Sequence, residues 1–252
     1  MPTCEIITVG TELTEGSRTN TNATWLAKRV TSVGITVERI TSVRDEPGEI
    51  AKAVSESVGR KVDLLIVGGG LGPTPDDRTL EGVCKGLGTD LVLSEKALKF
   101  VRESYSRMHA QGLVRSRRLN KARKKMAFIP RGADPLFNPV GAAPGVRLKH
   151  RGTHILCLPG VPAEMRAIFK QYAGDILKEI KGERKASVEI TVERGDESLM
   201  APLFDKLIRR FPGVEVRSYP SRGKVRVVLV ANTRSRANAA KSELLKLLGG
   251  RH

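Results

Sequence analysis

Two acidic loops hold the residues of this chain that could best do chemistry. The first is Gly10-Thr11-Glu12, which follows an apolar segment at the start of the chain. The second, residues 68–77, reads Gly-Gly-Gly-Leu-Gly-Pro-Thr-Pro-Asp-Asp. Glycines let a backbone come close to a phosphate because no Cβ stands in the way, and carboxylate oxygens are the ligands that hard divalent cations prefer. Together the loops predict a site for phosphate and metal.

The second loop also predicts a local structure. Residues 63–67 read Asp-Leu-Leu-Ile-Val, and their apolar run is typical of a buried parallel strand. We expect Thr74 to cap a helix that starts at Pro75, with Asp76 and Asp77 in its first turn. Carboxylates there would repel a phosphate, so we expect a divalent cation between them. In the simpler alternative, the two aspartates only complement the helix dipole.

The predicted site follows from these loops. Glu12, Asp76 and Asp77 are the expected catalytic and metal-binding residues. The expected substrate contacts in the glycine loop are Gly69, Gly70, Leu71, Gly72, Pro73 and Thr74.

Hydrophobic periodicity predicts an α/β fold for the first part of the chain. Residues 4–9, 35–43 and 63–67 have the pattern of strands, and helices are expected from Asn20 or Thr21 to Val33 and over residues 50–58. This β-α-β-α-β order predicts a three-layer, doubly wound and mostly parallel sheet. The carboxyl ends of such strands share one crevice, where the loops of Glu12 and Asp76 can meet.

A small second domain is predicted after a charged connector at residues 181–185. Strands over 187–192, 214–216 and 225–230 and helices over 199–211 and 237–248 give a βαββα order. We therefore expect domain 1–182 to bind the ligand and domain 183–252 to be a compact α+β unit. The second domain carries no catalytic constellation, so packing or dimerisation is its expected role.

The net charge of +17 also fits a different class of function. The electrostatic field of so basic a protein attracts nucleic acids as well as anionic metabolites. Aromatic residues make up only 4% of the chain, which argues against a platform for stacking single strands. Residues 104–133 contain no acid and nine lysines or arginines. This segment is either a solvated surface or a phosphate clamp, and Lys124 and Lys125 are the preferred clamp residues.

Several features predict the cellular location of the protein. No apolar run approaches the length of a membrane span, no signal peptide precedes Cys4, and the three cysteines lack metal-binding spacing. We expect a soluble cytoplasmic protein with reduced thiols and no membrane partner.

Five segments, in the same order along the chain, resemble the amino-terminal MoaB/Mog domain of CinA-like proteins. They are Gly10-Thr11-Glu12, Asn20-Thr21-Asn22-Ala23, the glycine loop with Asp76-Asp77, residues 138–145 (Asn-Pro-Val-Gly-Ala-Ala-Pro-Gly) and residues 158–165 (Leu-Pro-Gly-Val-Pro-Ala-Glu-Met). The resemblance implies metal-dependent hydrolysis of ADP-ribose-type diphosphates. Mog-type relatives imply the alternative, binding or adenylylation of molybdopterin. A basic nucleic-acid-binding protein without catalysis is the remaining alternative.

The resemblance also implies ligand contacts, cofactors and partners. Asn138 and Gly141 become ligand contacts, although the turn-forming sequence around Asn138 also fits bonding to its own backbone. The implied cofactor is Mg, Mn, Co or Ni, with potassium as a further candidate and molybdopterin under the alternative. A nucleotide or pterin phosphate is the implied partner, in a homo-oligomer, and no carboxyl-terminal amidohydrolase domain is expected. Ala142 and residues 122–126 depart from the family pattern.

Overall fold

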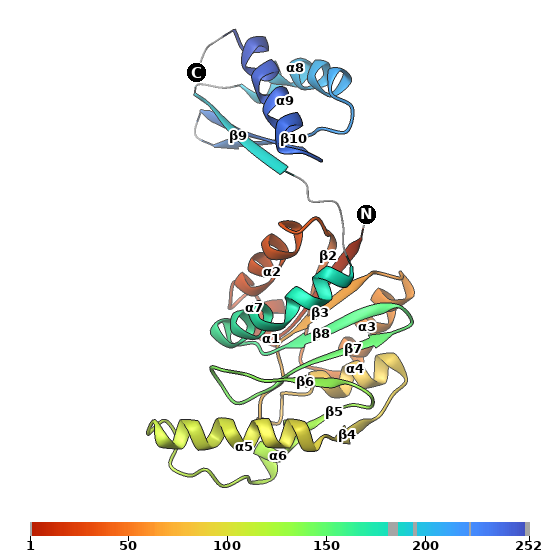
Figure 1. The fold of residues 1–252 in the computed structure, drawn as a ribbon, viewed down its shortest axis with the longest axis vertical. Coiled ribbons are helices and arrows are strands. Elements are labelled where there is room, and N and C mark those ends of the chain that lie inside the picture. Colours follow the sequence, from red (N-terminus) through yellow and green to blue (C-terminus); the bar gives the residue numbers. More distant parts are fainter. Residues whose placement is uncertain (1, 181–185, 194–195, 222, 250–252) are drawn as a thin grey trace. The chain divides into compact units, whose positions relative to one another are not determined.

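The computed structural model describes residues 2–180, 186–193, 196–221 and 223–249. The chain divides into two compact units, one made of residues 1–31 and 35–182 and the other of residues 32–34 and 183–252. Figure 1 shows the elements of each unit. The predicted connector at residues 181–185 lies outside the described residues.

A six-stranded sheet with the order β2-β1-β3-β8-β7-β6 forms the centre of the first unit. Four neighbouring strands are parallel, while β7 and β6 add to one edge in antiparallel fashion. The predicted mostly parallel α/β fold is confirmed. The strands are β1 (Thr3–Val9), β2 (Thr36–Val43), β3 (Leu64–Gly68), β6 (Asp134–Leu136), β7 (Gly145–His150) and β8 (Thr153–Leu158).

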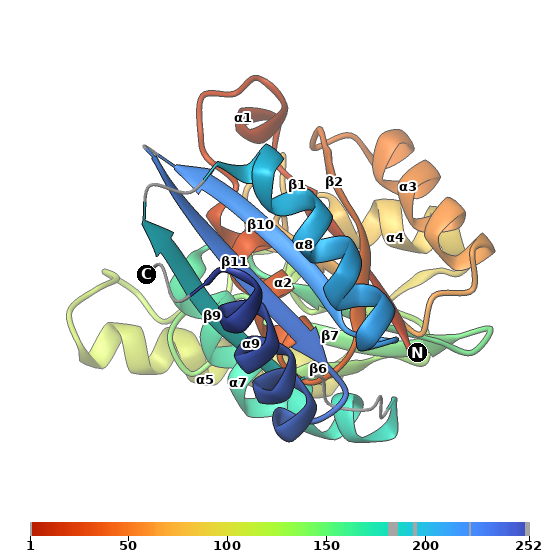
Figure 2. The ribbon, with the colours of Figure 1, turned by 90° about the horizontal axis from the view of Figure 1, so that it is seen from above.

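Helices cover both faces of this sheet, as views from two directions show (Figures 1 and 2). Ring contact between Trp25 and Phe169 joins α2 to α7, and α3 packs against α4. A separate two-stranded sheet pairs β4 (Leu91–Leu93) with β5 (Phe128–Pro130). The helices are α1 (Thr11–Thr14), α2 (Thr21–Thr31), α3 (Pro47–Gly59), α4 (Thr79–Leu87), α5 (Glu95–Ala110), α6 (Lys121–Lys125) and α7 (Pro162–Glu179).

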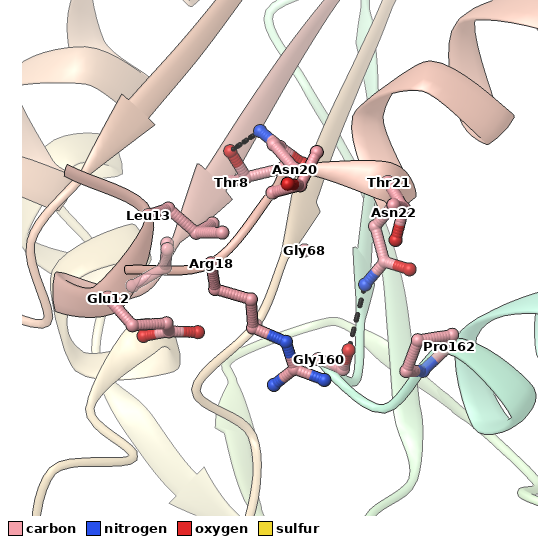
Figure 3. A pocket seen from close by; sticks show the side chains of 13 residues that line it. Thr8, Glu12, Leu13, Arg18, Asn20, Thr21, Asn22, Gly68, Gly160 and Pro162 are labelled. Carbon is pink, nitrogen blue, oxygen red and sulfur yellow. Dashed lines mark hydrogen bonds between the residues drawn. The ribbon is translucent and has the colours of Figure 1, made fainter. Parts of the chain in front are cut away.

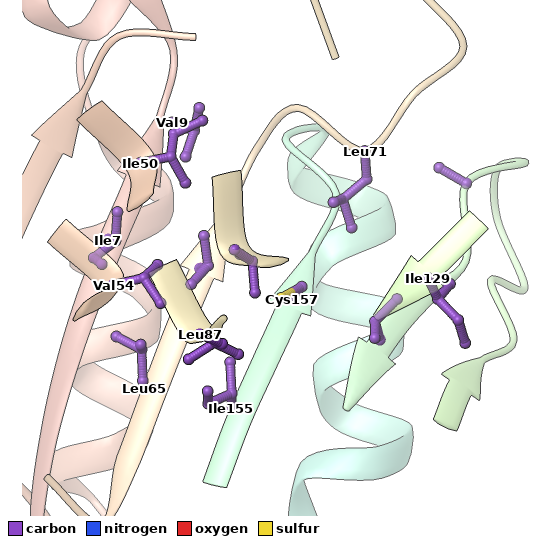
Figure 4. Close-up of a cluster of buried hydrophobic side chains, with 14 of the residues drawn as sticks. Ile7, Val9, Ile50, Val54, Leu65, Leu71, Leu87, Ile129, Ile155 and Cys157 are labelled. Atoms are coloured by element: carbon purple, nitrogen blue, oxygen red, sulfur yellow. The ribbon is translucent and has the colours of Figure 1, made fainter. Parts of the chain in front are cut away.

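Alternate strand residues form the core between the sheet and helices α3, α4 and α5. Ile7 and Leu65 from the strands meet Ile50 and Val54 of α3 there, all at most 1% exposed (Figure 4). Successive strand residues point to opposite faces, so both faces of these short strands must be apolar. This requirement explains why residues 63–67 have the continuous apolar pattern by which the strand was predicted.

The second unit has the predicted βαββα order. Its elements are β9 (Ala186–Glu193), α8 (Glu197–Arg210), β10 (Glu215–Ser221), β11 (Lys224–Ala231) and α9 (Arg234–Leu247). The strands form an antiparallel sheet in the order β10-β11-β9. Alternate residues of β9 and β11 pack with the helices, while the residues between them on β9 are exposed to solvent. Among the described residues of both units, no helix has the length and apolarity needed to cross a bilayer.

The start of α4 corrects one prediction. The helix begins at Thr79 rather than at Pro75, and Asp76 and Asp77 lie in a turn before it. The N–H and Oγ1 of Thr74 both donate to Oδ2 of Asp77, at 2.9 and 2.5 Å, and the Asp77 N–H donates to the Thr74 carbonyl at 3.1 Å. Such local bonds from a threonine and an aspartate compete with helix formation. Thr74 therefore closes a turn instead of capping a helix.

A charged residue lies inside the parallel sheet. Glu5 on β1 is 1% exposed, and its carboxylate accepts two hydrogen bonds from Arg60, at 2.7 and 2.8 Å, and one from Ser57 at 2.6 Å. Burial alone would raise the pKa of Glu5, but the bonds from Arg60 and Ser57 outweigh it and hold the pKa below its ordinary value. The carboxylate therefore stabilises the fold only while it is ionised.

We expect Glu5→Gln to lower the free energy of unfolding at pH 7 by about 1–3 kcal/mol, because it weakens the charge-assisted bonds from Arg60, whose side chain is 34% exposed and can regain water. A lowered folded pKa means that the wild-type contribution is present above the unfolded pKa of Glu, about 4.3, and is lost as the pH falls below it. Urea unfolding at pH 7 and pH 4 measures both effects. The control Glu56→Gln removes an exposed carboxylate 3.8 Å from the same Arg60; equal losses in the two variants would contradict the prediction.

Candidate functional site

The loops that leave β1, β2, β3 and β8 at their carboxyl ends border one cavity of about 500 Å³. This is the volume range of small-molecule sites, and this edge of a parallel sheet is where such folds bind ligands. The structure brings most of the predicted site residues together here. Those that line the cavity are Glu12, Gly69, Gly70, Leu71, Gly72, Pro73, Asp76, Asp77 and Gly141.

The glycine turn after β3 is fixed by its neighbours. The Gly69 N–H donates to the Leu158 carbonyl at 2.9 Å, and a Cβ on Gly69 would overlap the Val9 carbonyl oxygen. Gly69 and Gly70 have φ angles of 113° and 60°, which favour glycine. Among the described residues, the N–H groups of Gly70, Leu71 and Gly72 have no hydrogen-bond acceptor. Three successive donors along a cavity wall can bind an anion.

Within the part of the chain that the structure describes, five carboxylates and one cationic side chain line the cavity. Arg18 is that cation, and it lies in the loop between α1 and α2. Such an excess of negative charge repels a bare diphosphate, so an anionic ligand needs a cation between itself and the acids. The carboxylates are those of Glu12, Asp45, Asp76, Asp77 and Glu164.

Arg18, Asp45 and Glu164 were not among the site residues predicted from the sequence. Asp45 accepts hydrogen bonds from the N–H and Oγ1 of Thr11, at 2.7 and 3.0 Å, and so fixes the start of the Glu12 loop. The one signal for Asp45 was its position two residues after the strand predicted over 35–43. Arg18 lies far from the end of any predicted strand and belongs to no periodic pattern or glycine motif, so the sequence carried no such signal for it.

Glu164, in the first turn of α7, is the carboxyl group of the cavity with a raised pKa. Burial raises this pKa, and a hydrogen bond donated by Asn138 at 2.5 Å lowers it less. Gly141 faces the same carboxylate so closely that a Cβ there would overlap it. The pKa of Asp76 is lowered instead, by Thr74 first and by the charge of Lys125. The cavity therefore combines one carboxyl group with a lowered pKa, that of Asp76, and one with a raised pKa, that of Glu164.

The donor set fits a divalent metal that arrives with its substrate. Within the described residues, no three His, Cys, Asp or Glu side chains are grouped closely enough to hold an ion by themselves. Magnesium, however, is usually held by one or two carboxylates together with substrate phosphates. The lining of the cavity includes both carboxylates and the glycine turn with its free N–H groups, which are the two kinds of group that such shared binding needs.

Four predicted contacts do not line this cavity: Thr74, Lys124, Lys125 and Asn138. Lys125 donates from Nζ to the Thr74 carbonyl at 2.5 Å and so supports the acidic turn, while Lys124 is exposed. Asn138 is 1% exposed. Its Nδ2 donates to the carbonyl of Ala143 as well as to Glu164, and its Oδ1 accepts the N–H groups of Val140 and Gly141. In this structure Asn138 positions the cavity wall.

A smaller hollow of about 40 Å³ shares Glu12, Arg18 and Gly69 with the main cavity. Figure 3 shows Arg18 and Asn22 reaching toward Gly160 from the loop and helix that follow β1. The Asn22 Nδ2 donates to the Gly160 carbonyl at 2.8 Å, whereas its Oδ1 is buried with no partner among the described residues. A buried acceptor without a partner is costly, so this atom can accept a hydrogen bond from a ligand or a water.

Comparison with known proteins agrees with this geometry. The family model described as "Probable molybdopterin binding domain" matches residues 5–179. This chain belongs to that family. Protein PF0476 of Pyrococcus furiosus is 45% identical over 216 residues, which cover 86% of this chain and 84% of that protein. A protein of Aeropyrum pernix is 43% identical over 254 residues and covers 98% of this chain and 91% of its own length.

Among solved structures, this family member is similar to the protein CinA of Thermoplasma acidophilum, which is described as having unknown function. The two chains are 38% identical, with a TM-score of 0.62, and the match covers 69% of this chain and 98% of the other. The predicted resemblance to the MoaB/Mog domain of CinA-like proteins is confirmed.

Because the buried Asn138 side chain makes four hydrogen bonds, two of them buried and two partly buried, we expect Asn138→Ala to lower the free energy of unfolding by about 2–6 kcal/mol, at about 0.5–1.5 kcal/mol per bond. Chemical denaturation measures this loss. The matched control Asn238→Ala changes an exposed asparagine on α9 and should change stability by less than about 0.5 kcal/mol. Wild-type stability in Asn138→Ala would argue for a ligand contact rather than a supporting role.

Proposed function

We propose that this protein is a metal-dependent pyrophosphatase that hydrolyses dinucleotide diphosphates of the ADP-ribose type. One observation carries the proposal: the lining of a single cavity combines carboxylates from several loops with a glycine turn whose N–H groups at Gly70, Leu71 and Gly72 have no acceptor among the described residues. Diphosphate chemistry needs both groups, because the N–H donors bind phosphate oxygens and the carboxylates hold the neutralising cation.

Each residue of the site has a role in this proposal. The N–H groups of Gly70, Leu71 and Gly72 hold one phosphate, and Arg18 neutralises part of the charge of the other. Glu12, Asp76 and Asp77 are the candidate metal ligands. One or two of them, together with the substrate phosphates, would hold the divalent metal, which supplies charge neutralisation and lowers the pKa of a bound water. The turn formed by Thr74 and Asp77, supported from outside by Lys125, sets the direction of the two aspartates.

Glu164 is the group of the cavity best suited to exchange a proton. Its raised pKa brings proton exchange closer to neutral pH, where a general base is most effective. In the proposed reaction Glu164 accepts a proton from the attacking water, and Asn138 keeps the carboxylate directed into the cavity.

Binding or adenylylation of molybdopterin is the second candidate, and the family match over residues 5–179 favours it. The same N–H groups would hold the phosphate of the pterin. The two activities differ in what they need: adenylylation consumes ATP together with the pterin and releases pyrophosphate, whereas hydrolysis needs one nucleotide and a metal. Self-association stays a prediction for either function.

We expect purified protein to release AMP from ADP-ribose with Mg²⁺, Mn²⁺, Co²⁺ or Ni²⁺ and to lose turnover when the metal is chelated. Glu12→Gln should lower kcat roughly a hundredfold or more, because metal binding supplies several kcal/mol of transition-state stabilisation. Asp77→Asn should do the same, although its bonds to Thr74 require a parallel check of stability. Chromatographic detection of AMP measures the rates.

The control Asp205→Asn changes an exposed carboxylate on α8 of the second unit and should keep the wild-type rate. Turnover that survives in Glu12→Gln and in the double variant Asp76→Ala, Asp77→Ala would reject the proposed site. No turnover by the wild-type protein with any metal would favour the pterin reaction, to be assayed with ATP and molybdopterin.

A further inference from the structure

A second pocket of about 300 Å³ lies on the other side of the glycine turn. Its walls come from the start of α4, from the two-stranded sheet of β4 and β5, and from the end of α6. Among the described residues, five apolar side chains line it: Leu71, Leu80, Leu91, Met126 and Phe128. The proposed chemistry of the carboxylate cavity makes no use of this pocket.

Phe128 is the unusual residue of the pocket. Its ring is 41% exposed, although its neighbours Ala127 and Ile129 are at most 2% exposed. Phe128 pairs with Leu93 across the β4–β5 ladder, and Leu93 is exposed as well. Leu93, however, does not line the pocket. An exposed aromatic ring at the rim of an apolar pocket can stack on a flat ring of a ligand.

The charged side chains of the pocket balance one another. Arg78 is neutralised locally by a two-point ion pair with Glu81, at 2.6 and 2.8 Å. Among the described residues, the remaining charges of the lining are those of Lys125 and Asp77, which are opposite in sign. The apolar walls therefore decide the character of the pocket, and they suit a flat uncharged ring.

The pocket adjoins the carboxylate cavity, and the glycine turn lines both. Both are lined by Gly70, Leu71, Gly72, Asp77 and Met126. Glycine at two of these positions keeps the wall between them thin, because no Cβ adds to it. A group bound to the free N–H donors of the turn is therefore within reach of both hollows.

We propose that this pocket binds the aromatic base of a nucleotide whose phosphates lie on the glycine turn, with the base stacked on Phe128. The inference rests on the proposed function only in placing phosphates at the turn; it needs no hydrolysis. It assigns Phe128 as a residue that determines preference for nucleotides over simple diphosphates.

The test compares two ligands that share a non-hydrolysable diphosphate and differ in the nucleoside. Calorimetric titration with α,β-methylene-ADP and with methylenediphosphonate, both with Mg²⁺, gives the dissociation constants for wild type, Phe128→Ala, Phe128→Trp and Leu93→Ala. Phe128→Ala should weaken binding of α,β-methylene-ADP roughly 5- to 150-fold, the range for loss of one base–aromatic stack, and leave methylenediphosphonate unchanged. Phe128→Trp should keep the nucleotide affinity, because indole also stacks.

Leu93→Ala is the matched control, because it removes an equally exposed apolar side chain from the paired position outside the pocket. Equal effects of Phe128→Ala and Leu93→Ala would overturn the inference, as would wild-type protein that binds the two ligands equally or binds neither. Specific weakening in Phe128→Ala together with no hydrolysis of ADP-ribose would support the base pocket and reject the hydrolase. Hydrolysis of ADP-ribose with an unchanged KM in Phe128→Ala would support the hydrolase and reject the base pocket.

Discussion

The close approach of Gly69 to the Val9 carbonyl is the constraint on which the candidate site depends. It brings the turn after β3 against the end of β1, while the bond from the Gly69 N–H to Leu158 joins the same turn to β8. Any side chain at position 69 would separate these strand ends. Three loops distant in the sequence are thereby held around one cavity, and the next three N–H groups of the turn are left without acceptors.

The charge of the molecule and the charge of its site have opposite signs. The chain carries +17 overall, yet the cavity is lined by five carboxylates and one guanidinium. The two sets of charges act at different distances. The field of the whole molecule attracts anionic ligands from afar, whereas the acids of the cavity would repel them at contact. A cation bound together with the ligand reconciles the two, which is why metal dependence is central to the proposed chemistry.

Two arginines that the sequence places in a basic, solvent-facing segment have structural roles. Arg107 donates to the carbonyls of Asn138 and Gly141, at 3.2 and 2.9 Å, and so holds the loop opposite the glycine turn. Arg123 stacks on Tyr105 and donates to the carbonyls of Ser116 and Arg118. A charge run in a sequence does not reveal which of its members bond to the backbone, because that depends on carbonyls supplied by distant or irregular segments.

The sequence by itself determined the fold class, the acidic glycine loop and the order of elements up to that loop and in the second unit, because the apolar periods of strands and helices and the conformations open to glycine are local properties. Only the tertiary structure decided that α4 starts at Thr79, that Asn138 supports Glu164 from a buried position, and that Arg18 and Asp45 line the cavity. The start of α4 follows from local bonds between Thr74 and Asp77, whereas the other outcomes depend on segments far apart in the chain. Such bonds leave no periodic trace in the sequence, since each partner is an ordinary loop residue until the sheet brings the loops together.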